Sequence, residues 1–188
     1  MDEPLTEVLG RFAARTPAPG GASAAAVACA MAAALVEMAA GFAGEVGGAG
    51  AAGDRAAQLR QRAVELADLD LASYRPVLEA LRRGTDDPAR PDALAAALSA
   101  ATEVPLEVAR VSAEVSALAA GLADTGSRHL IGDATTAAVL AHAACQAATV
   151  LVQINLKGAT DERPTQAGQW CGDADVARQR ALSKAHES

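Results

Sequence analysis

Apolar residues recur every three or four positions over most of the chain, which is the spacing of amphipathic or buried α-helices. The pattern predicts helices over about 4–15, 22–42, 54–83, 92–122 and 133–157. Beyond residue 159 the pattern weakens, and we expect only a short polar helix from about Asp173 to Lys184. Short connections place successive long helices antiparallel. The predicted fold is therefore all-α, an up-and-down bundle of about five long helices over residues 1–162, followed by a C-terminal tail over 163–188.

Alanine supplies most of the apolar content. Of the 188 residues 51% are hydrophobic, with 51 alanines but only four aromatic side chains. This composition disfavours sheets, which are enriched in β-branched and aromatic residues, and it favours helices, because alanine has the best helix propensity. A buried methyl group contributes little hydrophobic free energy, so the core depends on a close approach of the helices. Such small side chains leave some apolar faces of the bundle uncovered, and burying these faces favours a homodimer.

Charge and cysteine content narrow the class of protein. The net charge of −7 opposes binding to nucleic acid or to anionic membranes. The three cysteines are far apart and lack the spacing of metal ligands, which indicates reduced thiols and gives no support for a metal site. The uncharged stretch 17–36 is as long as a membrane span, but its prolines and glycines and the following Glu37 argue against one. We expect a cytoplasmic protein that binds neither nucleic acid nor membrane.

Two places carry polar groups or free backbone donors where an alanine-rich bundle needs none. Asp70 lies in LADLDLASY, with Leu66 and Tyr74 one turn away on the same helix face. It is either a solvent-facing acid paired with an arginine or a buried carboxylate that moves protons. Gly20, Gly21 and Ser23 open a helix, whose first N–H groups are either capped locally or available to a carbonyl or carboxylate of a ligand.

Two further polar residues belong to the last long helix. Asp133 is in its first turn, where acidic residues are common because the positive end of the helix dipole stabilises their negative charge. Asn155 stands between Ile154 and Leu156 near the other end, where an amide needs a hydrogen-bond partner, either within the protein or on a ligand.

Five segments carry a family resemblance when they are taken together and in order. They are FAARTPAPGGASAAAVACAMAAALVEM, LADLDLASY with ALRRG, ATEVPLEVA, GDATTAAVLAHAA and VQINLKGATDE, over about residues 8–162. This set resembles the formiminotetrahydrofolate cyclodeaminase and methenyltetrahydrofolate cyclohydrolase family. The resemblance implies an all-helical homodimer that binds a reduced folate near the subunit interface.

The resemblance also implies the roles of individual residues. Asp70 matches the acid of the family's D-x-x-A-F/Y motif and is expected to be the catalytic carboxylate. The implied substrate-binding residues are Pro19, Gly20, Gly21 and Ser23 in the elbow, Asp133 and Asn155 in the same pocket, and Arg82 for a glutamate tail of the substrate.

The expected reaction is the hydrolysis of 5,10-methenyltetrahydrofolate to 10-formyltetrahydrofolate by general acid–base catalysis, without a metal or other cofactor. We favour this cyclohydrolase reaction because no formiminotransferase domain is fused. The alternatives are an ammonia-releasing cyclodeaminase and a catalytically silent folate-binding or scaffold dimer. The silent alternative is motivated by the GSRHLIGD segment and by Ala22, which adds a Cβ where the family usually has glycine.

Overall fold

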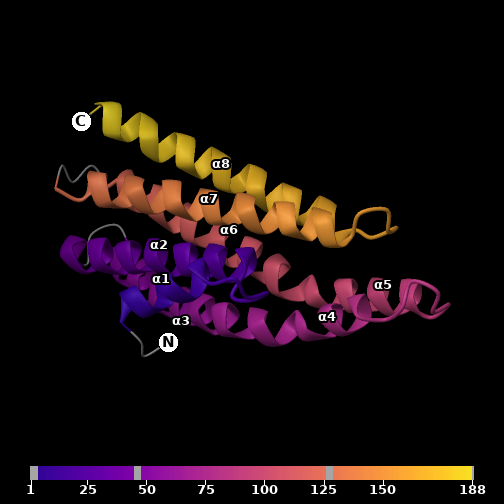
Figure 1. Cartoon of the computed structure of the whole chain (residues 1–188). Helices are drawn as coiled ribbons and strands as arrows, with labels where there is room; N and C mark the ends of the chain where they lie inside the picture. Colours follow the sequence, from indigo (N-terminus) through magenta and orange to yellow (C-terminus); the bar gives the residue numbers. More distant parts are fainter. Residues whose placement is uncertain (1–3, 45–47, 126–128, 188) are drawn as a thin grey trace.

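The computed structural model describes residues 4–44, 48–125 and 129–187, and these form helices and connecting loops without a strand (Figure 1). The described helices are α1 (Leu5–Ala13), α2 (Gly21–Ala43), α3 (Ala49–Ser73), α4 (Arg75–Leu81), α5 (Arg90–Ala101), α6 (Glu103–Ala123), α7 (Ile131–Asn155) and α8 (Arg163–Glu187). Five of them, α2, α3, α6, α7 and α8, have 21 to 25 residues. The predicted all-α fold is confirmed.

The helices α2, α3, α6, α7 and α8 form the body of the bundle. The central helix α2 packs against α3, α6 and α7, and α8 lies along α6 and α7. The two short helices α4 and α5 pair with each other around a small separate cluster of Val77, Ala80, Ala97 and Ala101. In Figure 1 this α4–α5 pair diverges from the end where α7 passes into α8. These two pairs of helices are therefore separated at one end of the molecule.

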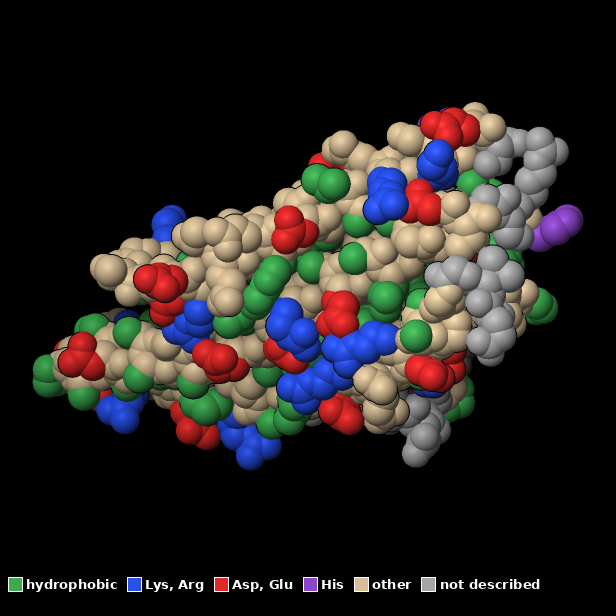
Figure 2. Space-filling view, turned by 180° about the vertical axis from the view of Figure 1, so that it is seen from behind, with side chains coloured by type: hydrophobic (Ala, Val, Ile, Leu, Met, Phe, Trp, Pro, Cys, Tyr) green, Lys and Arg blue, Asp and Glu red, His purple; other side chains and the backbone are tan. Residues whose placement is uncertain are grey.

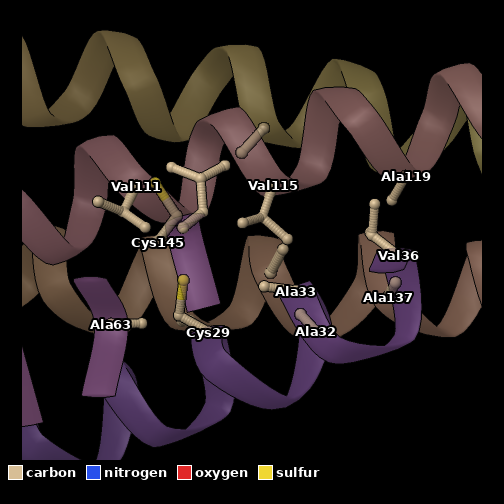
Figure 3. Close-up of a cluster of buried hydrophobic side chains, with 14 of the residues drawn as sticks. Cys29, Ala32, Ala33, Val36, Ala63, Val111, Val115, Ala119, Ala137 and Cys145 are labelled. Carbon is tan, nitrogen blue, oxygen red and sulfur yellow. The ribbon is translucent and has the colours of Figure 1, made fainter. Parts of the chain in front are cut away.

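Alanine and valine fill the main core (Figure 3). Side chains such as Ala32, Ala33 and Val36 of α2 meet Val111 and Val115 of α6 with no exposed surface. The helices pack closely because each side chain between them is small. Cys29 and Cys145 belong to the same cluster, and burial raises the pKa of their thiols to about 11 and about 12. Both thiols therefore stay protonated and pack as small apolar groups.

Two predicted helices are each divided in two. The segment predicted as 54–83 breaks at Tyr74, and the segment predicted as 92–122 breaks at Thr102. In both cases a proline follows within three residues, Pro76 in the first turn of α4 and Pro105 in the first turn of α6. Proline has no N–H, which a first turn does not need. A new helix therefore begins just before each proline.

The predicted short C-terminal helix is wrong in length. The observed helix α8 runs from Arg163 to Glu187 and packs on the bundle through four buried alanines. Ala167, Ala174 and Ala181 are spaced by seven residues, and Ala177 lies between two of them. This spacing places all four on one face of the helix. The residues expected to form a tail are therefore part of the folded bundle.

Ion pairs join α3 to its neighbours across the surface (Figure 2). The Arg55 guanidinium donates to both carboxylate oxygens of Glu114 on α6, from Nε at 2.5 Å and from Nη2 at 2.9 Å. Arg60 pairs with Glu37 on α2 at 2.8 Å. The arginine hydrogen bond holds the pKa of Glu114 below its usual value. Exposed pairs of this kind add little stability each, but they help to set the register of the helices.

By length and composition alone, α2 and α7 are apolar enough to cross a membrane, with 44% of each tested window buried within the chain. Both helices pack against each other in the core of the bundle. Core helices of soluble bundles meet the same criterion, so this finding is weak evidence for a membrane span.

Replacing Gly53 by alanine tests the close approach of α2 and α3. A Cβ at Gly53 would lie 3.1 Å from the Cβ of Ala40, whereas a Cβ at Gly50, one turn earlier in α3, would meet nothing within 4 Å. We expect Gly50→Ala to raise the free energy of unfolding by about 0.5–1 kcal/mol through helix propensity. We expect Gly53→Ala to lower it by about 1 kcal/mol, because overpacking outweighs that gain. Urea denaturation measures both, and equal stabilisation by the two variants would contradict the close approach.

Candidate active site

Ser23 holds the carboxylate of Asp70 against the start of α2. The Ser23 backbone N–H donates to Asp70 Oδ2 at 3.1 Å, and the Ser23 Oγ–H lies 2.8 Å from the same oxygen. The hydroxyl also lies 2.9 Å from the carbonyl oxygen of Ala67, one turn earlier in α3. Because a hydroxyl has one proton, it donates to one of these two acceptors at a time. The helix dipole of α2 and the N–H donor both stabilise negative charge at this point.

The environment of Asp70 decides between its two interpretations. Asp70 is 9% exposed, and no Lys or Arg of the described residues forms an ion pair with it. The solvent-facing acid paired with an arginine is therefore wrong. No described residue hydrogen-bonds Oδ1, so one oxygen of the carboxylate is held in place while the other remains available to a ligand.

The elbow before α2 brings the backbone close to Asp70 and to α7. A Cβ at Gly20 would lie 3.9 Å from Asp70 Oδ2, and one at Gly21 would lie 3.4 Å from Leu151 Cδ1. Pro19 follows a cis peptide bond from Ala18. The α2 N-terminus has no side-chain cap of its own, and the Ser23 N–H is taken by Asp70 from another helix. Ser23 therefore does not act as a local side-chain cap of α2.

A cleft of about 260 Å³ opens beside Asp70. Its lining residues are Pro17, Ala18, Gly20, Gly21, Ala22, Asp70, Tyr74, Ala101, Pro105, Leu151, Ile154 and Asn155. They come from the start of α2, the α3–α4 break, the α5–α6 break and the end of α7. The walls are mostly apolar, with a carboxylate and an amide as the polar side chains, which is the usual make-up of a small-molecule site. Among the described residues, no group of three or more His, Cys, Asp or Glu side chains is placed to hold a metal ion.

The structure brings most of the predicted site residues together. Asp70, Gly20, Gly21 and Asn155 line the cleft. Ser23 lies behind Asp70, and Pro19 lies within the elbow between two lining residues. The Asn155 amide has no hydrogen-bond partner among the described residues, so of the two interpretations the structure favours an amide that is available to a ligand.

Asp133 does not lie in this cleft. It is in the first turn of α7, and Asn155 is the last residue of the same helix, so the two are about 33 Å apart along the axis. The expectation that both line one pocket is wrong within a single chain. Arg82 ends α4, is exposed and does not line the cleft either.

The structure also shows lining residues that the sequence reasoning missed. Tyr74, Leu151 and Ile154 form apolar walls, and Ala101 and Pro105 close one side. A signal existed for two of them. Tyr74 is one turn after Asp70, and Leu151 is one turn before Asn155.

Ala22 fits the elbow without strain. It lies in the first turn of α2, and no described non-glycine residue has a positive φ. The concern that a Cβ there conflicts with the backbone conformation is therefore unfounded, although the Cβ does contribute to the cleft wall. In the GSRHLIGD segment, residues 126–128 lie outside the described residues.

The fold and the site define an all-α bundle protein with a buried carboxylate in a cleft between helix ends. Among such proteins, this chain belongs to the formiminotransferase-cyclodeaminase family, whose model matches residues 4–169. A similar solved structure is the formiminotetrahydrofolate cyclodeaminase from Thermotoga maritima, with 28% sequence identity and a TM-score of 0.87. The alignment covers 99% of this chain and 97% of that one. No functionally curated protein matches the chain.

Replacing Ser23 by alanine tests the link between α2 and α3. The change removes the Oγ donor while the backbone N–H remains, and we expect the free energy of unfolding to fall by about 1–3 kcal/mol, because a buried carboxylate loses a hydrogen bond. Thr136→Ala is the matched control, since its hydroxyl bonds a carbonyl oxygen at an exposed position of α7. Urea denaturation of both variants gives the comparison. Equal, small losses would show that Ser23 does not hold Asp70.

Proposed function

We propose that this protein is a folate one-carbon enzyme that hydrolyses 5,10-methenyltetrahydrofolate to 10-formyltetrahydrofolate in the cleft beside Asp70. The observation that carries the proposal is the arrangement of the Asp70 carboxylate, with Oδ2 held by Ser23 and Oδ1 unpartnered beside an apolar cleft. The family and the name of the Thermotoga maritima relative support the substrate class.

The chemistry follows from one carboxylate. The bridging carbon of the substrate belongs to a delocalised amidinium cation, which the Asp70 carboxylate stabilises by its charge. Water adds to this carbon and gives its proton to Asp70. The proton then passes to N5 as the bond between the carbon and N5 breaks. The hydroxyl group on the carbon loses its remaining proton to solvent as the carbonyl forms, and the formyl group stays on N10. Such general acid–base catalysis contributes about 10²–10⁴ in rate. The reaction as written consumes no redox equivalent and requires no metal.

The apolar walls and the amide of the cleft have supporting roles in this proposal. Tyr74, Leu151 and Ile154 restrict the access of bulk water, which strengthens the attraction between the carboxylate and the cation. The Asn155 amide offers two donors and one acceptor to the polar edge of the substrate ring.

Cyclodeamination is the second candidate, favoured by the name of the similar solved structure. In that reaction N10 attacks the formimino carbon of 5-formiminotetrahydrofolate and ammonia leaves, with the same carboxylate moving the proton from N10 to the leaving nitrogen. The extent of this chain does not separate the two reactions, because the Thermotoga maritima chain, named as a cyclodeaminase, is matched over 97% of its own length.

The absorbance of 5,10-methenyltetrahydrofolate tests both reactions with one signal. Hydrolysis lowers it when methenyltetrahydrofolate is supplied, and cyclodeamination raises it when 5-formiminotetrahydrofolate is supplied. We expect Asp70→Asn to lower kcat at least about 100-fold, because the amide cannot accept the proton. Asp54→Asn, which changes an exposed carboxylate of the same helix, should leave kcat unchanged.

Each result of this assay has a clear meaning. A wild-type protein that changes the absorbance in neither direction contradicts both reactions, and calorimetric binding of the folate without turnover then supports the silent folate-binding alternative. Equal rates for wild type and Asp70→Asn remove Asp70 from the mechanism.

The proposal includes a homodimer formed through the exposed faces of α2 and α7. Met31, Met38 and Phe42 are exposed on α2, and Val150 and Ile154 are exposed on α7. An apolar groove is lined by Gly21 of α2 and by residues of α7 that include Ala147 and Val150. The groove is next to the cleft, because Gly21 and Leu151 line both. Apolar stripes of this extent on a small protein favour burial against a partner. A second copy of the chain would also enlarge the cleft, which is small for a whole folate.

We further propose a cytoplasmic location without nucleic acid or membrane partners. Three free cysteines, two of them buried, suit a reducing compartment. The net charge of −7 disfavours polyanions.

Val150→Glu tests the proposed dimer interface. Val150 is 46% exposed in the single chain, so glutamate is tolerated by the monomer fold but places an unpaired charge in the interface. We expect wild-type protein to be a dimer by light scattering at micromolar concentration and Val150→Glu to be a monomer. Val176→Glu, on the outer side of α8 and 67% exposed, should remain a dimer. A monomeric wild type would contradict the interface.

A further inference from the structure

Arg163, the first residue of α8, uses every donor of its side chain. Nη1 donates to the carbonyl oxygen of Ser99 at 2.9 Å and to Glu103 Oε1 at 2.5 Å. Nη2 donates to Ser99 Oγ and to Asp161 Oδ2, both at 2.7 Å, and Nε donates to Asp161 Oδ1 at 3.0 Å. A guanidinium has five N–H groups, so none is left over. The side chain is 20% exposed, which shields these bonds from water.

The groups that Arg163 binds flank the break between α5 and α6. Ser99 is in the last turn of α5 and Glu103 is the first residue of α6. Pro105 has no N–H and cannot bond the Ala101 carbonyl, although the Leu106 N–H bonds the Thr102 carbonyl at 3.0 Å. Ala101 and Pro105 are also the residues of this break that line the cleft. The bonds of Arg163 therefore span the break at the place where Pro105 supplies no backbone hydrogen bond between α5 and α6.

Arg163 is itself fixed to the loop that follows α7. Asp161 accepts hydrogen bonds from the Arg163 side chain and from its backbone N–H at 2.9 Å. These bonds lower the pKa of Asp161 to about 2, so the pair stays ionised at neutral pH. This loop begins directly after Asn155, which also lines the cleft. Arg163 thus joins two segments that contribute to the cleft wall, the end of α7 and the α5–α6 break.

We propose that Arg163 is a positioning residue, which holds the α5–α6 break at the width that the substrate requires. Arg163 does not line the cleft, so it acts through Ala101 and Pro105. The inference rests on the proposed function only for the identity of the substrate.

Three variants separate positioning from general stability. Arg163→Met removes all five donors. Arg163→Lys keeps the charge, but its donors share one nitrogen and cannot reach Asp161 and Ser99 together. Arg178→Met is the matched control, because Arg178 lies on the same helix and its hydrogen bonds within the described residues go to Asp175 alone.

Two measurements on the full-length protein apply to each variant. The first is hydrogen exchange, without ligand, of the backbone amides of Thr102 and Leu106, which bond the Leu98 and Thr102 carbonyls at the α5–α6 break. We expect exchange at least about tenfold faster in Arg163→Met, an intermediate rate in Arg163→Lys and no change in Arg178→Met. The second is steady-state kinetics with 5,10-methenyltetrahydrofolate or, where cyclodeamination is the activity, 5-formiminotetrahydrofolate. We expect KM to rise about tenfold in Arg163→Met, which corresponds to about 1.4 kcal/mol, and about threefold in Arg163→Lys, with kcat nearly unchanged.

The outcomes are distinguishable. Unchanged exchange at Thr102 and Leu106 in Arg163→Met overturns the inference whatever the substrate is. A fall in kcat at constant KM also overturns it, because a partly unfolded sample loses active molecules without changing the cleft. If wild-type protein turns over neither folate, the proposed function fails, and the exchange measurement alone decides whether Arg163 holds the cleft wall.

Discussion

The close packing of alanine faces is the constraint on which the rest of this structure depends. Each buried methyl group contributes little, so stability requires many contacts along long helices that approach one another closely. The core accordingly contains fully buried residues such as Ala26, Ala33 and Ala119 on several helices. Such a contact has little room for a larger side chain, because a Cβ at Gly53 would lie 3.1 Å from the Cβ of Ala40. Long, closely packed helices leave no space for a ligand in the middle of the bundle.

The candidate site therefore lies where helices end. The start of α2, the α3–α4 and α5–α6 breaks and the end of α7 all contribute to one cleft. Helix ends also supply the unpaired backbone groups that a polar site needs. The Ser23 N–H at the start of α2 binds the Asp70 carboxylate near the end of α3, and Arg163 at the start of α8 binds both sides of the α5–α6 break. The same helix ends thus organise the carboxylate and the walls around it.

Asp70 and Asn155 could be predicted from the sequence because each is a polar residue within an apolar helical pattern. The role of Asp133 came only from the family resemblance, and within one chain its position along α7 puts it far from Asp70 and Asn155. Part of the apolar wall carried a signal, because Tyr74 and Leu151 lie one turn from Asp70 and Asn155. The rest could not be predicted, since apolar residues at helical spacing look the same in a core and in a cleft. The helix α8 was largely missed because its buried face consists of alanines only, and few large apolar residues mark it.

The sequence by itself determined the helical fold, because alanine at this abundance favours helices locally, and it marked the elbow through glycine and proline. Only the tertiary structure decided which helix ends meet. That Ser23 binds a carboxylate 47 residues away, and that Arg163 reaches Ser99 across 64 residues, depends on how the helices pack around α2 and α6. Periodicity specifies which face of a helix is buried, but alanine faces resemble one another too closely to specify the partner.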